Sequence, residues 1–93
     1  MGLKSSDRFE KAPGLEVNEV PDGYVVYQSE RDHVHYLNNV AAVIFELCDS
    51  KHSLAEIGDV LQAAYALDTV PAEEVKASLQ RLLEESLILT CAA

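Results

Sequence analysis

The hydrophobic period of this chain changes once, after Leu37, and this change constrains the fold more than any other feature. Before it, three short runs rich in β-branched and aromatic residues are separated by polar turns, a pattern typical of strands. Short connections between consecutive strands predict an antiparallel sheet in which the strands lie in chain order. The third strand is then an edge of the sheet. The predicted strands are residues 15–20, 24–28 and 33–37.

Beyond this point, apolar residues recur at intervals of three and four, which predicts helices. Asn38 or Asn39 can cap the first helix by accepting from its free backbone N–H groups. After a polar break at residues 49–52, the segment Ser53–Glu56 matches a capping box and predicts the start of a second helix. Pro71 suits the first position of a third helix.

The expected fold is therefore α+β, with a three-stranded antiparallel sheet followed by three helices. This order is like a winged helix-turn-helix with its strands placed first. Residues 87–89 add a short strand or cap the core. At 93 residues the chain is long enough for one domain with a modest core. We expect a flexible N-terminal segment at residues 1–14, the domain at residues 15–90 and a tail at residues 91–93.

The chain is strongly acidic, with 16 Asp and Glu against 7 Lys and Arg and a net charge of −9. From Asn38 onward, the only basic residues are Lys51, Lys76 and Arg81, against nine acidic ones. Binding to nucleic acid depends on cations at the phosphates, so this balance argues against it. It also disfavours contact with anionic membrane surfaces. An acidic winged-helix regulator or scaffold that acts through protein contacts stays an alternative.

The two cysteines and the N-terminus point to a cytoplasmic protein. Cys48 and Cys91 are too far apart in sequence for a local metal or redox motif, and Cys48 falls in an apolar helical pattern. No apolar run approaches the ~18 residues that a membrane span needs. The N-terminus lacks the apolar core of a signal peptide.

No catalytic motif accompanies the histidines of this chain. His33 and His35 share one face of the third predicted strand, where alternate residues could jointly bind a metal ion. The favoured interpretation is that they are two polar residues on a side of the strand that faces solvent or a groove. We expect a protein that is not an enzyme and has neither a metal nor another cofactor.

The third predicted strand carries neither charge nor proline between Val34 and Leu37. An unprotected strand edge can accept an extended peptide as a further strand, which bonds through the main chain. The alternatives are an edge covered by the C-terminal helix or by a second copy of the protein. The free protein is accordingly expected to be a monomer or a weak homodimer.

The segments Tyr36–Ile44, Leu47–Asp49 and Ser53–Ile57 together resemble the coenzyme PQQ synthesis protein D family, whose members are also known as RiPP recognition elements. A looser similarity extends the match to roughly residues 15–90. The resemblance implies a peptide chaperone without catalytic residues. Such a chaperone binds the leader segment of a ribosomally made precursor peptide and presents it to a modifying enzyme, often a radical SAM protein.

The resemblance also implies where the leader binds, namely along the third strand and in a groove beside the third helix. The pairing residues would be Val34, His35, Tyr36 and Leu37. The groove wall would come from Val75, Lys76, Leu79, Leu82 and Leu83, of which Lys76 and Leu83 are the expected direct contacts. Ser86 stands where glycine is common in the family, and serine tolerates a left-handed helix end less readily. A locally different turn is therefore expected there.

Overall fold

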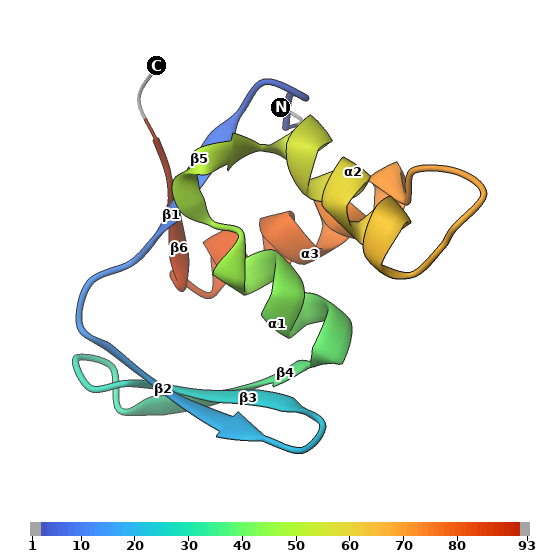
Figure 1. The fold of residues 1–93 in the computed structure, drawn as a ribbon. Helices are drawn as coiled ribbons and strands as arrows, with labels where there is room; N and C mark the ends of the chain where they lie inside the picture. The colour runs from blue at the N-terminus through green and yellow to red at the C-terminus, as the bar shows by residue number, and fades with distance from the viewer. Residues whose placement is uncertain (1–2, 92–93) are drawn as a thin grey trace.

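The computed structural model describes residues 3–91, which form two three-stranded antiparallel sheets and three helices (Figure 1). The predicted α+β class and the three-stranded sheet followed by three helices are confirmed, and the second sheet is an addition to them. In chain order the elements are β1 (Arg8–Lys11), β2 (Leu15–Val20), β3 (Gly23–Gln28), β4 (His33–Asn38), α1 (Asn39–Glu46), β5 (Asp49–Ser53), α2 (Leu54–Ala64), α3 (Ala72–Glu84) and β6 (Ile88–Thr90).

The main sheet has the order β2-β3-β4, as the short turns predict. The pairing of β3 with β4 is continuous from Gly23 opposite Asn38 to Gln28 opposite His33. Gly23 is required at the start of β3, because its φ of +149° is disfavoured for other residues and a Cβ there would collide with the carbonyl oxygen of Leu37. The sheet forms one layer, on which α1 packs (Figure 1).

The second sheet has the order β5-β1-β6 and corrects two expectations. Residues 8–11 do not belong to a flexible segment: they form the central strand, and the side chain of Phe9 is fully buried. Residues 49–53 are a strand rather than a polar break between helices. Of the two alternatives for residues 87–89, a short strand or a cap on the core, the structure has a strand, β6. Just after it, the Cys91 N–H donates to the Arg8 carbonyl over 2.9 Å, so the described part of the expected tail is bonded to β1.

The first two helices begin as their sequences predict. The Asn38 side chain accepts from the Ala41 N–H over 2.9 Å at the start of α1. The capping box of α2 is complete, because the Ser53 N–H donates to Glu56 Oε1 over 2.8 Å and the Glu56 N–H donates to Ser53 Oγ over 3.2 Å. Pro71 precedes α3 as its cap residue instead of occupying its first turn.

The C-terminal end of α3 keeps the turn that a glycine would give. Ser86 has a φ of +61°, its N–H donates to the Leu83 carbonyl over 3.0 Å, and the next N–H, of Leu87, donates to the Leu82 carbonyl over 2.9 Å. These two bonds define a Schellman motif. The expected local difference at Ser86 is therefore absent, and the serine adopts the left-handed conformation itself.

The core lies between the main sheet, the three helices and β1 with β6. Its buried side chains come from β1, β3, β4, β6 and all three helices, and from residues next to them. No helix in residues 3–91 is long and apolar enough to cross a membrane. The core includes Phe9, Val26, Ile44, Phe45, Ile57, Val75, Leu79 and Ile88.

Candidate functional site

The free edge of β4 presents backbone groups that no other strand uses. The carbonyl oxygen of Leu37 lies against Gly23, so the main chain of Leu37 faces β3. Inward and outward backbone groups alternate along an antiparallel strand. The N–H and C=O groups of Val34 and Tyr36 therefore point away from β3, to the open side. β2, the other edge of this sheet, carries Glu16 and Glu19, and charged side chains discourage strand addition.

Successive side chains of β4 point to opposite faces of the sheet. Leu37 is buried and His35 half-buried on the face that meets the helices. Val34 and Tyr36 are on the outer face, with 66% and 58% of their surface exposed. The Tyr36 hydroxyl donates to the Asp22 carbonyl over 3.1 Å, which holds the ring along this face. β4 thus combines a fixed inner face with an accessible outer face and edge.

A groove of about 720 Å³ separates β4 from α3. Its floor is formed by apolar side chains of α1, and its polar groups come from both β4 and the α3 wall. All four predicted pairing residues line it, as does Leu82. The lining residues are Val34, His35, Tyr36, Leu37 and Asn38 of β4, Val40 and Ala41 of α1, Glu74, Ala77, Ser78, Arg81 and Leu82 of α3, and Glu85 and Leu87 beyond it.

The face that α3 turns to the groove differs from the expected one. Val75 and Leu79 are fully buried behind the wall, so they support it without being reachable. Lys76 and Leu83, the expected direct contacts, do not line the groove. Residues three and four apart share a helical face, and the groove face is instead the stripe that sequence reasoning missed. That stripe consists of Glu74, Ala77, Ser78, Arg81 and Glu85.

A partly buried polar network lies at one end of the groove. Gln28 of β3 is 6% exposed, and its Nε2 donates to the carbonyls of Glu85 over 3.0 Å and Ser86 over 3.2 Å. Its Oε1 is therefore the acceptor that faces His35 Nε2 at 2.6 Å. His35 Nδ1 lies 3.4 Å from Glu85 Oε2, an ion pair when the imidazole carries both protons. The network ties both β3 and β4 to the end of α3.

The two histidines of β4 lie close together. The rings of His33 and His35 stand edge to face with centroids 6.1 Å apart. No group of three or more His, Cys, Asp or Glu side chains within residues 3–91 is placed to hold a metal ion. His35 serves the network with Gln28 and Glu85 instead.

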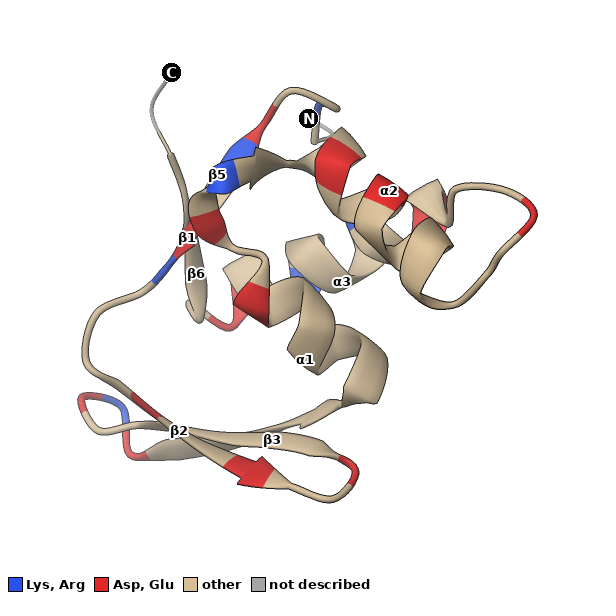
Figure 2. Ribbon diagram, in the orientation of Figure 1, with Lys and Arg blue, Asp and Glu red and all other residues tan. Residues whose placement is uncertain are grey.

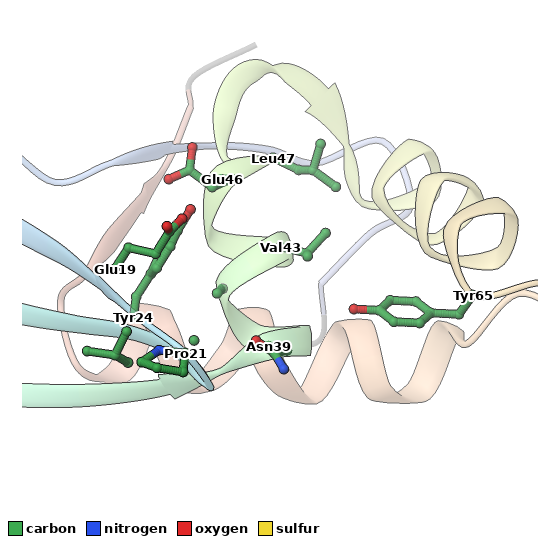
Figure 3. A pocket seen from close by; sticks show the side chains of 11 residues that line it. Glu19, Pro21, Tyr24, Asn39, Val43, Glu46, Leu47 and Tyr65 are labelled. Atoms are coloured by element: carbon green, nitrogen blue, oxygen red, sulfur yellow. The ribbon is translucent and has the colours of Figure 1, made fainter.

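A second hollow, of about 810 Å³, lies on the other side of α1 (Figure 3). Val43 of α1, Leu47 just after this helix and Tyr65 at the end of α2 give it an apolar lining. Its strand residues come from the end of β2 and the start of β3, which pair with each other. Burial there, together with the carboxylates of Glu46 and Glu19, raises the pKa of Tyr24. The edge strand beside this hollow is β2, whose Glu16 and Glu19 discourage strand addition.

The groove wall carries charges of both signs. Figure 2 marks Asp and Glu on most elements and Lys and Arg at fewer positions. On the groove wall, Arg81 faces the same space as Glu74, while Glu85 is engaged by His35. The charged groups of the groove lining are therefore two carboxylates and one guanidinium, so a cation is available within it. An extended peptide with a mainly apolar inward face fits this combination of edge, floor and wall.

Comparisons with known proteins agree with this geometry. The sequence profile of the coenzyme PQQ synthesis protein D (PqqD) family matches residues 23–88. No curated protein sequence matches the chain significantly.

Three solved structures share the fold. A structure of lasso peptide synthetase B1 complexed with the leader peptide is 24% identical, with a TM-score of 0.75 over 88% of this chain and 98% of that one. TbiB1 in complex with the TbiA(beta) leader peptide is 21% identical, with a TM-score of 0.75 over 90% and 99%. The heterocyclase TruD is 17% identical, with a TM-score of 0.68 over 92% of this chain but 12% of that protein.

Proposed function

The chain belongs to the coenzyme PQQ synthesis protein D family, and on this premise we propose that it binds the leader segment of a ribosomally made precursor peptide. The leader adds to the free edge of β4 as a fourth strand and lies in the groove against α3. Two proteins of the same fold, lasso peptide synthetase B1 and TbiB1, are known in complex with leader peptides. This supports the same class of ligand here.

The observation that carries the proposal is the open edge of β4 beside the groove. Val34 and Tyr36 turn their backbone groups to the side where a peptide strand would pair. Main-chain bonds would supply affinity, and side chains that alternate into the groove would supply specificity. The rigid link from Gln28 and His35 to the end of α3 keeps the edge and the wall at a fixed separation before any peptide arrives. Such pre-organisation lowers the cost of binding.

We further propose that the protein performs no chemistry of its own. It presents the bound leader to a separate modifying enzyme, of which radical SAM proteins are the expected class. The free protein is proposed to be a cytoplasmic monomer or weak homodimer. Light scattering with and without leader tests the oligomeric state, because capture of a peptide on β4 should dissociate any dimer that pairs through that edge.

The test of strand addition compares two substitutions at one position. Tyr36→Thr removes the ring but keeps the backbone N–H, whereas Tyr36→Pro also removes the N–H that faces the open side. We expect the proline variant to bind a leader peptide that the wild-type protein binds at least about tenfold more weakly than the threonine variant does. Circular dichroism should show both variants folded, since the bonds between β3 and β4 are retained.

An NMR titration places the site independently. The leader should shift the amide signals of residues 33–38 and of the groove face of α3, with little change at α2. Equal affinity of the two Tyr36 variants, or shifts centred on the hollow around Tyr65, would contradict binding at β4.

A further inference from the structure

Arg81 is the one Lys or Arg of the described chain that lines the groove. It is exposed on the α3 wall and forms no ion pair with any described residue. The nearest acidic residues along the helix are Glu84 and Glu85, and Glu85 faces His35 instead. A guanidinium without a partner, beside a free strand edge, is placed to meet a carboxylate that comes with the ligand.

We propose that Arg81 is a specificity-determining residue that selects leader peptides with an aspartate or glutamate facing it. This inference rests on the proposed function and names the chemistry of the peptide. The net charge of −9 repels acidic peptides in general, so a carboxylate is tolerated only where a local cation receives it. Charge at an interface sets specificity and partner choice more than affinity alone.

The spacing along the groove predicts a sequence pattern in the leader. Ala77 and Ser78 leave room on the wall for a larger apolar side chain, over a floor formed by Val40 and Ala41. Ala77 lies four residues before Arg81, about 6 Å along the helix axis. Side chains on one face of a strand recur every two residues, roughly 6.7 Å apart. The acidic residue of the leader should therefore stand two positions from an apolar residue that covers Ala77.

The direction of the peptide decides the order of the two residues. His35 of β4 meets Glu85, so the start of β4 lies at the C-terminal end of α3. A leader antiparallel to β4 would present the apolar residue first and the acidic residue two positions later. A parallel leader would reverse this order, so the selected pattern also reports the direction of strand addition.

The experiment is a selection from a displayed library of random 12-residue peptides against three proteins. Arg81→Glu reverses the proposed contact, and Lys76→Glu makes the same change of charge on the same helix away from the groove. Wild type and Lys76→Glu should both enrich Asp or Glu at one position, two residues from an apolar one. Arg81→Glu should lose this preference and enrich Lys or Arg there.

Affinities measured with the enriched acidic peptide complete the test. They should fall at least about tenfold in Arg81→Glu and less than about twofold in Lys76→Glu, and a lysine in place of the peptide's acid should restore binding to Arg81→Glu. Arg81→Gln, which avoids a new cluster of carboxylates on α3, should give an intermediate loss. The difference between the two Glu variants should shrink at 1 M salt.

Two kinds of failure are distinguishable. Peptides that shift the amides of β4 but bind wild type and Arg81→Glu alike, with no acidic preference, would overturn the role of Arg81 and leave the proposed function intact. A selection that yields no peptide acting on β4 would overturn the proposed function itself, and this inference with it.

Discussion

Replacing Gln28 with methionine should destabilise the protein by more than the loss of one hydrogen bond, because the Gln28 amide takes part in three. Methionine keeps the length and volume of the side chain, so packing changes little, but it removes one acceptor and two donated hydrogen bonds. Gln28 Nε2 donates to the carbonyls of Glu85 and Ser86, and His35 Nε2 faces Gln28 Oε1. The Glu85 carbonyl is one of the helix-end acceptors that α3 cannot satisfy internally.

The expected loss follows from these three bonds. A hydrogen bond contributes about 1 kcal/mol net, and a buried group left without a partner costs about 1–3 kcal/mol. The apolar character of methionine recovers part of this loss, because Gln28 is 6% exposed. We therefore expect the free energy of unfolding to fall by about 2–3 kcal/mol. For a domain of this size, that corresponds to a decrease in Tm of roughly 10–20 °C.

Urea and thermal unfolding followed by circular dichroism measure this change. The control is Gln80→Met, the same substitution at an exposed position of α3, which should alter stability by less than about 0.5 kcal/mol. A Gln28→Met variant as stable as the control would refute the view that this amide joins the sheet to the end of α3. Loss of leader affinity in Gln28→Met at a temperature where it is fully folded would show that the link also positions the groove.

Three further predictions concern stability and reactivity. Ser86→Gly should raise the free energy of unfolding by about 1 kcal/mol, because glycine adopts the φ of +61° without the strain of a side chain; an unchanged urea midpoint would argue against strain there. Hydrogen bonds from the His52 side chain and the Lys51 backbone lower the pKa of Asp49 from 3.8 to about 2. Since the folded pKa is the lower one, this stabilisation is complete above pH 3.8 and is lost as the pH falls towards 2, so Asp49→Asn should lose less stability than wild type between pH 5 and pH 2.5 in urea titrations. Burial raises the pKa of Cys48 to about 12, so mass spectrometry after iodoacetamide at pH 8 should find Cys48 unmodified in the folded protein and alkylated in urea.

The parts of the fold that could be predicted are those that local sequence determines. The meander of β2, β3 and β4 follows from turns of few residues, and α2 follows from a capping box within four residues. Each of these elements finds its partner or its cap close by in the chain. β1 is different, because the run Arg8–Lys11 contains a single apolar residue and its partners lie some forty and eighty residues away. β5 carries neither β-branched nor aromatic side chains, so it is a strand only because β1 offers it an edge.

The candidate site also has a part that could be predicted from the sequence and a part that could not, and α3 contains both. Apolar spacing marks the side of this helix that meets the core, and Val75, Leu79 and Leu82 are buried as expected. It cannot say which flank of that stripe faces a ligand, since a polar groove and open solvent favour the same residue types.

The choice between the two flanks is made by tertiary contacts. Gln28 and His35 hold the end of α3 against the sheet, so the flank with Arg81 is turned to β4 and the flank with Lys76 is turned away. Each flank carries one cation, and the two cations are separated by about 8 Å along the helix axis. A sequence pattern treats the two cations as equivalent, whereas in the structure only Arg81 lines the groove. Comparison of Arg81→Glu with Lys76→Glu therefore tests the packing of α3 as directly as it tests recognition.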